Sequence, residues 1–228
     1  MSGPNEIYQG VFRQCGIIRA QTLTELFDYA LALGTIRRPR GNRVIIQTHS
    51  GGPGATAADS CGRAGLMLPP LSMETVEKLR PLIPKTASTA NPVDMTFSKN
   101  HADDFFNIPD ILLHEKNADM LLAYFLTPSI FIERILKEMG VPAESIPAER
   151  DKMIAQYADA FCNLKKRHPD KPIIGFTYRS LQEKMVRHLL DQGIPVYQDP
   201  ERAARSIAAV LQYYKMQDGI TKVAPCNP

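Results

Sequence analysis

A glycine-rich stretch that contains a histidine and a serine, Thr48–Gly54 (THSGGPG), is the part of this 228-residue sequence best suited to chemistry. It follows the short apolar run Val44–Ile46, which is typical of a strand buried on both faces. Glycines after such a strand let the backbone turn sharply and approach a ligand. The free N–H groups that open the next helix, together with the helix dipole, then form an anion site. The candidate phosphate ligands are His49, Ser50, Gly51, Gly52 and Gly54.

The glycines alone do not separate this anion site from a tight strand-to-helix turn that binds nothing. The stretch lacks the Gly-Lys-Ser/Thr ending of a P-loop and the GxGxxG spacing of a dinucleotide fold. Ser50 has no glycine two residues before it, as a nucleophile elbow requires. His49 can donate to a phosphate or be phosphorylated, but the sequence favours a loop histidine bonded to a backbone carbonyl.

Two further polar segments are candidates for the mouth of a ligand crevice. The loop Asn91–Asp94 offers an amide and a carboxylate, or else forms an Asx turn bonded to itself. Arg179 follows a later strand, where it faces an anion across the crevice or is simply solvated. Thr127 comes directly after the clearest strand, Met120–Leu126.

Composition excludes several classes of protein. A hydrophobic fraction of 44% with 22% charged residues is that of a folded globular chain. The net charge of +3 is mild and dispersed, so no nucleic-acid partner is expected. No apolar run approaches the roughly 20 residues of a membrane span, and the N-terminus does not resemble a signal peptide. We therefore expect a cytoplasmic protein with no membrane partner.

Metal-binding patterns are absent from the sequence. The four cysteines share no CxxC spacing, and no HExxH motif is present. Besides His49, the histidines lie at predicted helix ends or faces and are interpreted as surface residues, so no metal site is expected. These are His101, His114, His168 and His188.

From Arg43 onward, short apolar runs alternate with segments of helical spacing. Strands are expected at 44–46, 66–68, 120–126, 172–176 and 194–197. Helices are expected at 53–64, 72–82, 103–115, 129–139, 147–168, 180–193 and 200–214. Capping boxes at Thr22–Glu25 and Ser180–Glu183, an N-cap at Ser72, and Asp199 before Pro200 mark helix starts.

This alternation predicts an α/β fold of three layers, with a five-stranded parallel sheet in the flavodoxin-like order 2-1-3-4-5. The ligand crevice would lie at the carboxyl ends of strands 1 and 3, beside the loops 49–54 and 127–128. The linker Ile36–Asn42, rich in Arg, Pro and Gly, predicts a boundary. We expect a helical segment with its linker at 1–40, the α/β domain at 41–216 and a tail at 217–228.

Five segments resemble motifs of the NDP-forming acyl-CoA synthetases, of which ADP-forming acetyl-CoA synthetase is the best-known type. Residues 11–19 (VFRQCGIIR) resemble FRQAG(V/I)IR, and 22–33 resemble the helix that follows it. Residues 48–54 resemble TN(A/S)GGPG, with His49 where asparagine is usual. Residues 90–96 resemble ANPVD(L/M)T, and 194–209 resemble the closing IPVYxxPERAxRAxAA.

The resemblance implies an enzyme built like succinyl-CoA synthetase, with a CoA-binding domain, two flavodoxin-like domains and an ATP-grasp region. Such enzymes convert acid, CoA and ATP to acyl-CoA, ADP and phosphate through a phosphohistidine in an SHTGxLAG motif. Residues 3–35 look like the tail of the first flavodoxin-like domain, and 43–214 look like the second. The histidine motif, the CoA-binding domain and the ATP-grasp region have no counterpart in these 228 residues. The helix after Gly51 resembles one of two helices that hold the phosphohistidine.

The expected function is therefore that of one domain of an acyl-CoA ligase, inactive alone and without a tightly bound cofactor. CoA and ATP or ADP with Mg would serve the complete enzyme, whose other domains or subunits would be the partners. The first forty residues would dock on the main domain, pair between copies as a homo-oligomer, or stay mobile. The alternative is a non-catalytic regulatory module, like the CoA-ligase-like region of a protein lysine acetyltransferase. A flavodoxin that binds FMN is the weakest interpretation, because no aromatic pair is placed to hold the flavin.

Overall fold

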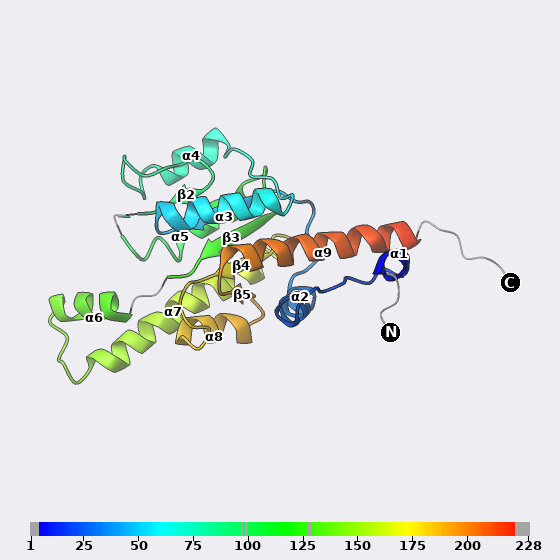
Figure 1. The fold of residues 1–228 in the computed structure, drawn as a ribbon. Coiled ribbons are helices and arrows are strands. Elements are labelled where there is room, and N and C mark those ends of the chain that lie inside the picture. Colours follow the sequence, from blue (N-terminus) through cyan, green and yellow to red (C-terminus); the bar gives the residue numbers. More distant parts are fainter. Residues whose placement is uncertain (1–4, 97, 99, 127–128, 222–228) are drawn as a thin grey trace.

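The computed structural model describes residues 5–96, 98, 100–126 and 129–221 as nine helices and five strands (Figure 1). The elements follow in this order: α1 (Asn5–Gln14), α2 (Leu23–Thr35), β1 (Val44–Thr48), α3 (Gly51–Arg63), α4 (Met73–Leu79), β2 (Val93–Asp94), α5 (Asn107–His114), β3 (Met120–Tyr124), α6 (Ser129–Glu138), α7 (Ile146–Arg167), β4 (Ile173–Phe176), α8 (Lys184–Asp191), β5 (Val196–Tyr197) and α9 (Pro200–Thr221). None of the helices in the described ranges has the length and apolar character needed to cross a membrane.

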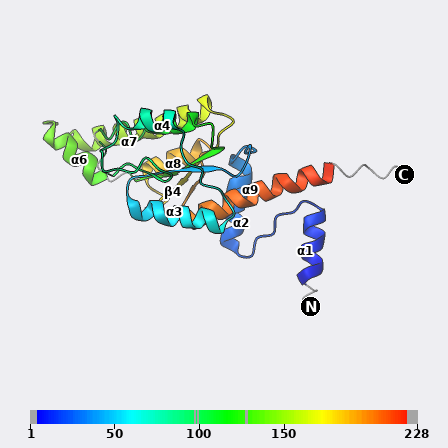
Figure 2. The ribbon, with the colours of Figure 1, turned by 90° about the horizontal axis from the view of Figure 1, so that it is seen from above.

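The strands form one sheet in the order β2-β1-β3-β4-β5, and every neighbouring pair is parallel. The predicted fold class and strand order are thus confirmed. Parallel strands need crossovers, and these carry helices onto both faces of the sheet (Figure 2).

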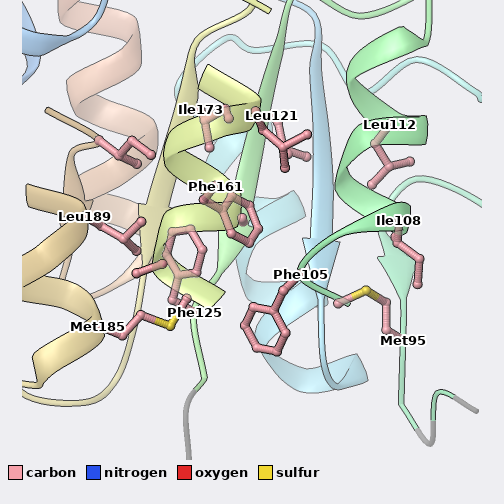
Figure 3. Packing of buried hydrophobic residues seen from close by; sticks show 14 of the residues in the cluster. Met95, Phe105, Ile108, Leu112, Leu121, Phe125, Phe161, Ile173, Met185 and Leu189 are labelled. Carbon is pink, nitrogen blue, oxygen red and sulfur yellow. The ribbon is translucent and has the colours of Figure 1, made fainter. Parts of the chain in front are cut away.

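The three central strands are buried along their whole length, and alternate residues point to opposite faces. Ile45 and Leu121 pack with α4, α5, α6, α7 and α8, whereas Ile46 and Leu122 pack with α2, α3 and α9. Figure 3 shows the first of these clusters, in which the rings of Phe125 and Phe161 meet edge to face, 4.7 Å between centroids.

The second strand is not the one that the apolar pattern predicted. Met67, in the expected strand 66–68, forms only an isolated bridge with Arg43, and Pro69 and Pro70 follow it without N–H groups to continue a ladder. The edge strand β2 lies instead within the loop predicted at 91–94, where Val93 pairs with Gln47.

The side chain of Asn91 takes the place of a strand beside the first half of β1. Its Oδ1 accepts from the N–H of Ile46 at 3.0 Å, and its Nδ2 donates to the carbonyls of Val44 at 2.8 Å and Pro69 at 3.1 Å. The side-chain amide of Asn91 therefore connects β1 to the segment around Pro69, where the expected second strand does not form.

Replacing Asn91 with alanine is expected to lower the free energy of unfolding by about 2 kcal/mol, because the N–H of Ile46 and the carbonyl of Val44 lose their partner inside the sheet. Urea unfolding would measure this loss. The control is Asn42→Ala, which removes one exposed hydrogen bond to the carbonyl of Gly65 and should cost about 0.5 kcal/mol. Equal losses in the two variants would contradict the strand-like role of Asn91.

Most predicted helix starts are confirmed by their caps. The N–H of Glu25 donates to Thr22 Oγ1 at 3.1 Å, the N–H of Thr75 to Ser72 Oγ at 3.3 Å, and the N–H of Arg202 to Asp199 Oδ1 at 2.7 Å. The carboxylate of Glu25 reaches one residue further back than a capping box requires and accepts from the N–H of Gln21.

The second predicted capping box, at Ser180–Glu183, is wrong. The hydroxyl of Ser180 accepts from the N–H of Gln182 in a local turn, and α8 begins only at Lys184. A matching pair of residue types does not create a capping box unless the backbone between them is already helical.

Helix α2 packs on the main body of the fold, whereas α1 contacts it through α9. Ala32 and Ile36 are buried in the cluster formed with α3 and α9, and Arg202 of α9 holds Asp28 of α2 through two hydrogen bonds. No residue of α1 is buried, and the helix projects near the end of α9 (Figure 2). The division of the chain into 1–40, 41–216 and 217–228 stays a prediction.

Candidate functional site

The candidate site is the junction where β1 passes into α3, at the carboxyl edge of the sheet. Ser50 is the N-cap in an extended conformation, and α3 begins at Gly51, two residues earlier than predicted. Thr48 fixes the junction, since its Oγ1 donates to the carbonyl of Ser50 at 2.8 Å and accepts from its N–H at 3.2 Å.

The first turn of α3 presents N–H groups that have no partner within the described part of the chain. The N–H groups of Gly51 and Gly52 precede the first residue that can bond within a helix, whereas Pro53 has none and Gly54 donates to the carbonyl of Ser50. The hydroxyl of Ser50 makes no capping bond. Two N–H groups and one hydroxyl are therefore available to an anion.

The glycines of this turn have different tasks. A Cβ on Gly54 would lie 2.8 Å from Cγ2 of Thr48, so the lack of a side chain lets α3 pack closely on β1. A Cβ on Gly51 would lie 3.6 Å from Oδ2 of Asp94, and one on Gly52 would meet nothing within 4 Å. Gly54 is thus needed for packing, whereas Gly52 borders open space in front of the helix.

Asp94, at the end of β2, places a carboxylate beside the start of α3. Its Oδ1 accepts from the N–H of Thr96 at 2.9 Å and from the hydroxyl of Thr96 at 2.6 Å. That hydroxyl also lies 3.1 Å from the carbonyl of His49, so Thr96 links the two loops. The partial positive charge at the start of α3 stabilises this carboxylate, and a bound phosphoryl group would interact with the same partial charge.

The imidazole of His49 turns inward, onto aromatic neighbours. Its ring centroid lies 5.9 Å from that of Phe105 and 6.4 Å from that of Tyr124, and its Nδ1 lies 3.6 Å from Oδ2 of Asp104. Burial, followed by the charge of His101, lowers the pKa of His49 to about 4, against a smaller opposing effect of Asp94. At neutral pH the ring is therefore uncharged and offers an anion no net attraction.

Asp104 is a buried carboxylic acid that the sequence pattern did not single out. Burial raises its pKa to about 6, although hydrogen bonds from Ser98 and His101 oppose the shift. Among the described residues, Oδ1 of Asp104 and Oε1 of Gln47 have no hydrogen-bond partner, while Nδ1 of His101 lies 3.4 Å from Oδ2. Both members of the His49–Asp104 pair thus favour their neutral forms.

The two shifts predict opposite pH dependences of stability. The pKa of His49 is depressed, so its contribution is complete above pH 6.5 and is lost as the pH falls towards 4. The pKa of Asp104 is raised, so its contribution is complete below pH 3.8 and is lost as the pH rises through 6. Between pH 4 and 6 the two nearly cancel in the natural chain.

Single substitutions are expected to expose each slope. Asp104→Asn removes the contribution of Asp104 and leaves that of His49. The free energy of unfolding of this variant, measured against that of the natural chain at the same pH, should therefore be about 2 kcal/mol lower at pH 4 than at pH 7. The corresponding difference for His49→Asn should be higher at pH 4 than at pH 7. Urea unfolding at pH 4, 5, 6 and 7 would test both, and parallel curves for all three proteins would contradict the pairing.

The structure brings part of the predicted site together. His49, Ser50, Gly51 and Asp94 meet around the start of α3, where the hydroxyl of Thr96 joins their loops. Asn91, in contrast, serves the backbone of β1. Arg179 pairs with Glu183, Nη2 to Oε1 3.2 Å, and Thr127 lies outside the described residues.

The fold is the succinyl-CoA synthetase-like version of the flavodoxin-like α/β/α class. PH0766 of Pyrococcus horikoshii shares it, with a TM-score of 0.76 and 29% identity over 94% of this chain and 45% of that one. An acetyl-coenzyme A synthetase of Ca. Korarchaeum cryptofilum, solved with phosphate and ADP, has a TM-score of 0.75 at 23% identity, covering 100% of this chain and 45% of that one.

Curated relatives narrow the class to a family. The chain is 31% identical to the alpha subunit of ADP-forming acetate–CoA ligase II of Pyrococcus furiosus, over 96% of this chain and 44% of that subunit. It is 33% identical to ADP-forming acetate–CoA ligase I of Archaeoglobus fulgidus, over 95% of this chain and 27% of that protein. No family profile matches the chain. The chain is a homologue of the ADP-forming acetyl-CoA synthetases, and it spans less than half the length of these relatives.

Proposed function

We propose that this chain acts as the second flavodoxin-like domain of an NDP-forming acyl-CoA synthetase, where the start of α3 holds the phosphoryl group of a phosphohistidine. The observation that carries the proposal is the open first turn of α3, with the N–H groups of Gly51 and Gly52 and an uncommitted Ser50 hydroxyl. The homology to ADP-forming ligases supports it.

The residues of the turn would share the work of stabilising the charge. The N–H groups of Gly51 and Gly52 donate to phosphoryl oxygens, and the helix dipole adds attraction at no cost in reorganisation. The hydroxyl of Ser50 supplies a third donor. The phosphorylated histidine would come from a part of the enzyme outside these 228 residues, together with the sites for CoA and for ATP or ADP with Mg.

The same proposal assigns a partner to the exposed apolar residues of the first two helices and of the segment between them. Leu23 and Phe27 are about two-thirds exposed. The other exposed members are Ile7, Tyr8, Val11, Ile17 and Leu26. Exposed apolar residues gathered in one part of a chain favour an interaction site, and we assign it to the preceding flavodoxin-like domain.

Reconstitution tests the proposal. The purified chain is mixed with the remaining domains or subunits of the enzyme, and acyl-CoA formation from acetate, CoA and ATP is followed. We expect no turnover by the chain alone and restored turnover by the mixture. A mixture no more active than the other domains without the chain would overturn the proposal and would favour a non-catalytic module instead.

A further inference from the structure

A cluster of two histidines and one aspartate lies at the sheet edge opposite the anion site. Asp110 and His114 are on α5, whose end leads to the start of β3. His168 is the C-cap of α7, which leads to the start of β4. Segments that are more than 50 residues apart in the chain thus contribute to one cluster at the amino ends of adjacent strands.

The ligand atoms of the cluster are already close together. One atom from each of Asp110, His114 and His168 lies within 4.8 Å of the others. Nε2 of His168 lies 2.9 Å from Oδ1 of Asp110, near the ~3.3 Å that separates neighbouring ligands in a tetrahedral zinc site. The two imidazole rings stand perpendicular at 4.6 Å between centroids, so the two histidines are in direct contact.

A second contact prepares His114 for this role. Its Nδ1 lies 2.8 Å from the carbonyl oxygen of Asp110, one turn earlier on α5. Nδ1 is also the nitrogen that lies 3.9 Å from Oδ1 of Asp110. When Nδ1 donates to the carbonyl, Nε2 keeps the free lone pair that would bind an ion once the side chain turns. The side chain of His114 is 63% exposed and can move to close the remaining distance.

The surroundings leave room for a fourth ligand. Asp110 and His114 line a surface cavity of about 500 Å³, and His168 lines a second one of about 380 Å³. Water can therefore complete the coordination of an ion from either side. Two imidazole nitrogens, one carboxylate oxygen and one open position form a ligand set that suits Zn²⁺.

Positive charges oppose a cation here: the cavity beside His168 is also lined by Arg37, Lys165, Lys166 and Lys171, and Arg167 pairs with Asp110. Nη1 of Arg167 lies 3.2 Å from Oδ1 of Asp110, the atom that would bind the metal. The guanidinium is 57% exposed and can turn away, so it weakens the affinity for a cation without blocking the site. If the cluster binds a cation, removing the charge of Arg167 should strengthen that binding. A cluster held together only by ion pairs would gain nothing from the same change.

We infer that Asp110, His114 and His168 form a binding site for a zinc-like divalent transition cation, which ties α5 to the end of α7. Binding through Nε2 of His168 requires a free lone pair on that nitrogen, so any hydrogen that it shares with Asp110 moves to Nδ1 or to solvent as the ion binds. The site is separate from the start of α3 and does not depend on the proposed function.

The test is calorimetric titration of the full chain with Zn²⁺, in a Cys15→Ser/Cys226→Ser background that removes two cysteine thiols able to bind zinc. We expect one site per chain and a Tm rise of about 5 °C at saturating Zn²⁺. Co²⁺ should give the visible absorption of a tetrahedral complex.

Three variants decide the assignment. His114→Gln, an exposed change, should weaken Zn²⁺ binding about 100-fold, and Arg167→Gln should tighten it severalfold. The matched control is His188→Gln, because His188 Nε2 lies 2.8 Å from Oδ1 of Asp159 in a pair that has no third ligand among the described residues. Failure of the natural chain to bind Zn²⁺ at millimolar concentration, or equal losses in His114→Gln and His188→Gln, would overturn the inference.

Discussion

Replacing Gly52 with aspartate is expected to slow acyl-CoA formation by the reconstituted enzyme about 100-fold, the scale of losing one donor that stabilises transition-state charge. A Cβ at Gly52 meets nothing within 4 Å, so the larger side chain does not disturb the packing of α3. The new carboxylate would stand in front of the N–H groups that are proposed to hold the phosphoryl group. It would repel that group and compete with it for the same donors.

The stability of this variant should not fall, which separates a lost site from a lost fold. An acidic residue in the first turn interacts favourably with the helix dipole, by about 0.5 kcal/mol. Thermal unfolding should therefore give a Tm at or above that of the natural chain. The position of the substitution, not its effect on folding, would then account for the lost activity.

Gly62 provides the matched control near the other end of the same helix. A Cβ there also meets nothing within 4 Å, but Gly62 lies far from the first turn of α3. Gly62→Asp should lower the Tm slightly, through an unfavourable charge near the helix C-terminus, and leave acyl-CoA formation within about twofold of the natural rate. Full activity of Gly52→Asp, or equal inhibition by both variants, would show that the start of α3 does not hold the phosphoryl group.

Local rules predicted the parts of this fold that depend on nearby residues. The glycines after Val44–Ile46 indicated a strand that turns into a helix, and the structure has α3 there. The parallel sheet with helices on both faces followed from the alternation of strands and helices, and the count of five strands fitted the order 2-1-3-4-5. The caps at Thr22, Ser72 and Asp199 were predictable for the same reason, since each bonds within three residues.

Long-range contacts decide the features that the sequence did not predict. Val93 joins the sheet because it meets Gln47, 46 residues earlier, and a two-residue strand has no periodicity of its own. His49 turns inward because Asp104, Phe105 and Tyr124 surround its ring. Asp104 fell within a predicted helix, 103–115. In the structure α5 begins only at Asn107, so Asp104 lies in the turn that precedes the helix, next to the loop that contains His49.

The contact between α2 and α9 is another such long-range feature, and breaking it is expected to have the largest effect on stability. Nε and Nη2 of Arg202 donate to the two carboxylate oxygens of Asp28 at 2.8 and 2.7 Å. The side chain of Asp28 is 7% exposed and that of Arg202 is 21% exposed. The hydrogen bonds to Asp28 raise the pKa of Arg202, so the guanidinium stays charged at any physiological pH.

Arg202→Met should lower the free energy of unfolding by about 4 kcal/mol, since it leaves the carboxylate of Asp28 buried without a partner. Urea unfolding would measure the loss, and proteolysis between α1 and α2 should accelerate as α2 detaches. The control is Arg63→Met, because Arg63 pairs with Asp59 on the surface of α3, both 67% exposed, and should cost at most about 0.5 kcal/mol.

The double variant Asp28→Leu/Arg202→Met should regain most of the loss, because apolar side chains replace a buried ion pair with little penalty. Such a recovery would mean that the single variant suffers from an unpaired charge rather than from lost packing. If Arg202→Met cost no more than Arg63→Met, α2 would not be held by this pair. Its docking would then rest on Ala32 and Ile36, which are buried against α3 and α9.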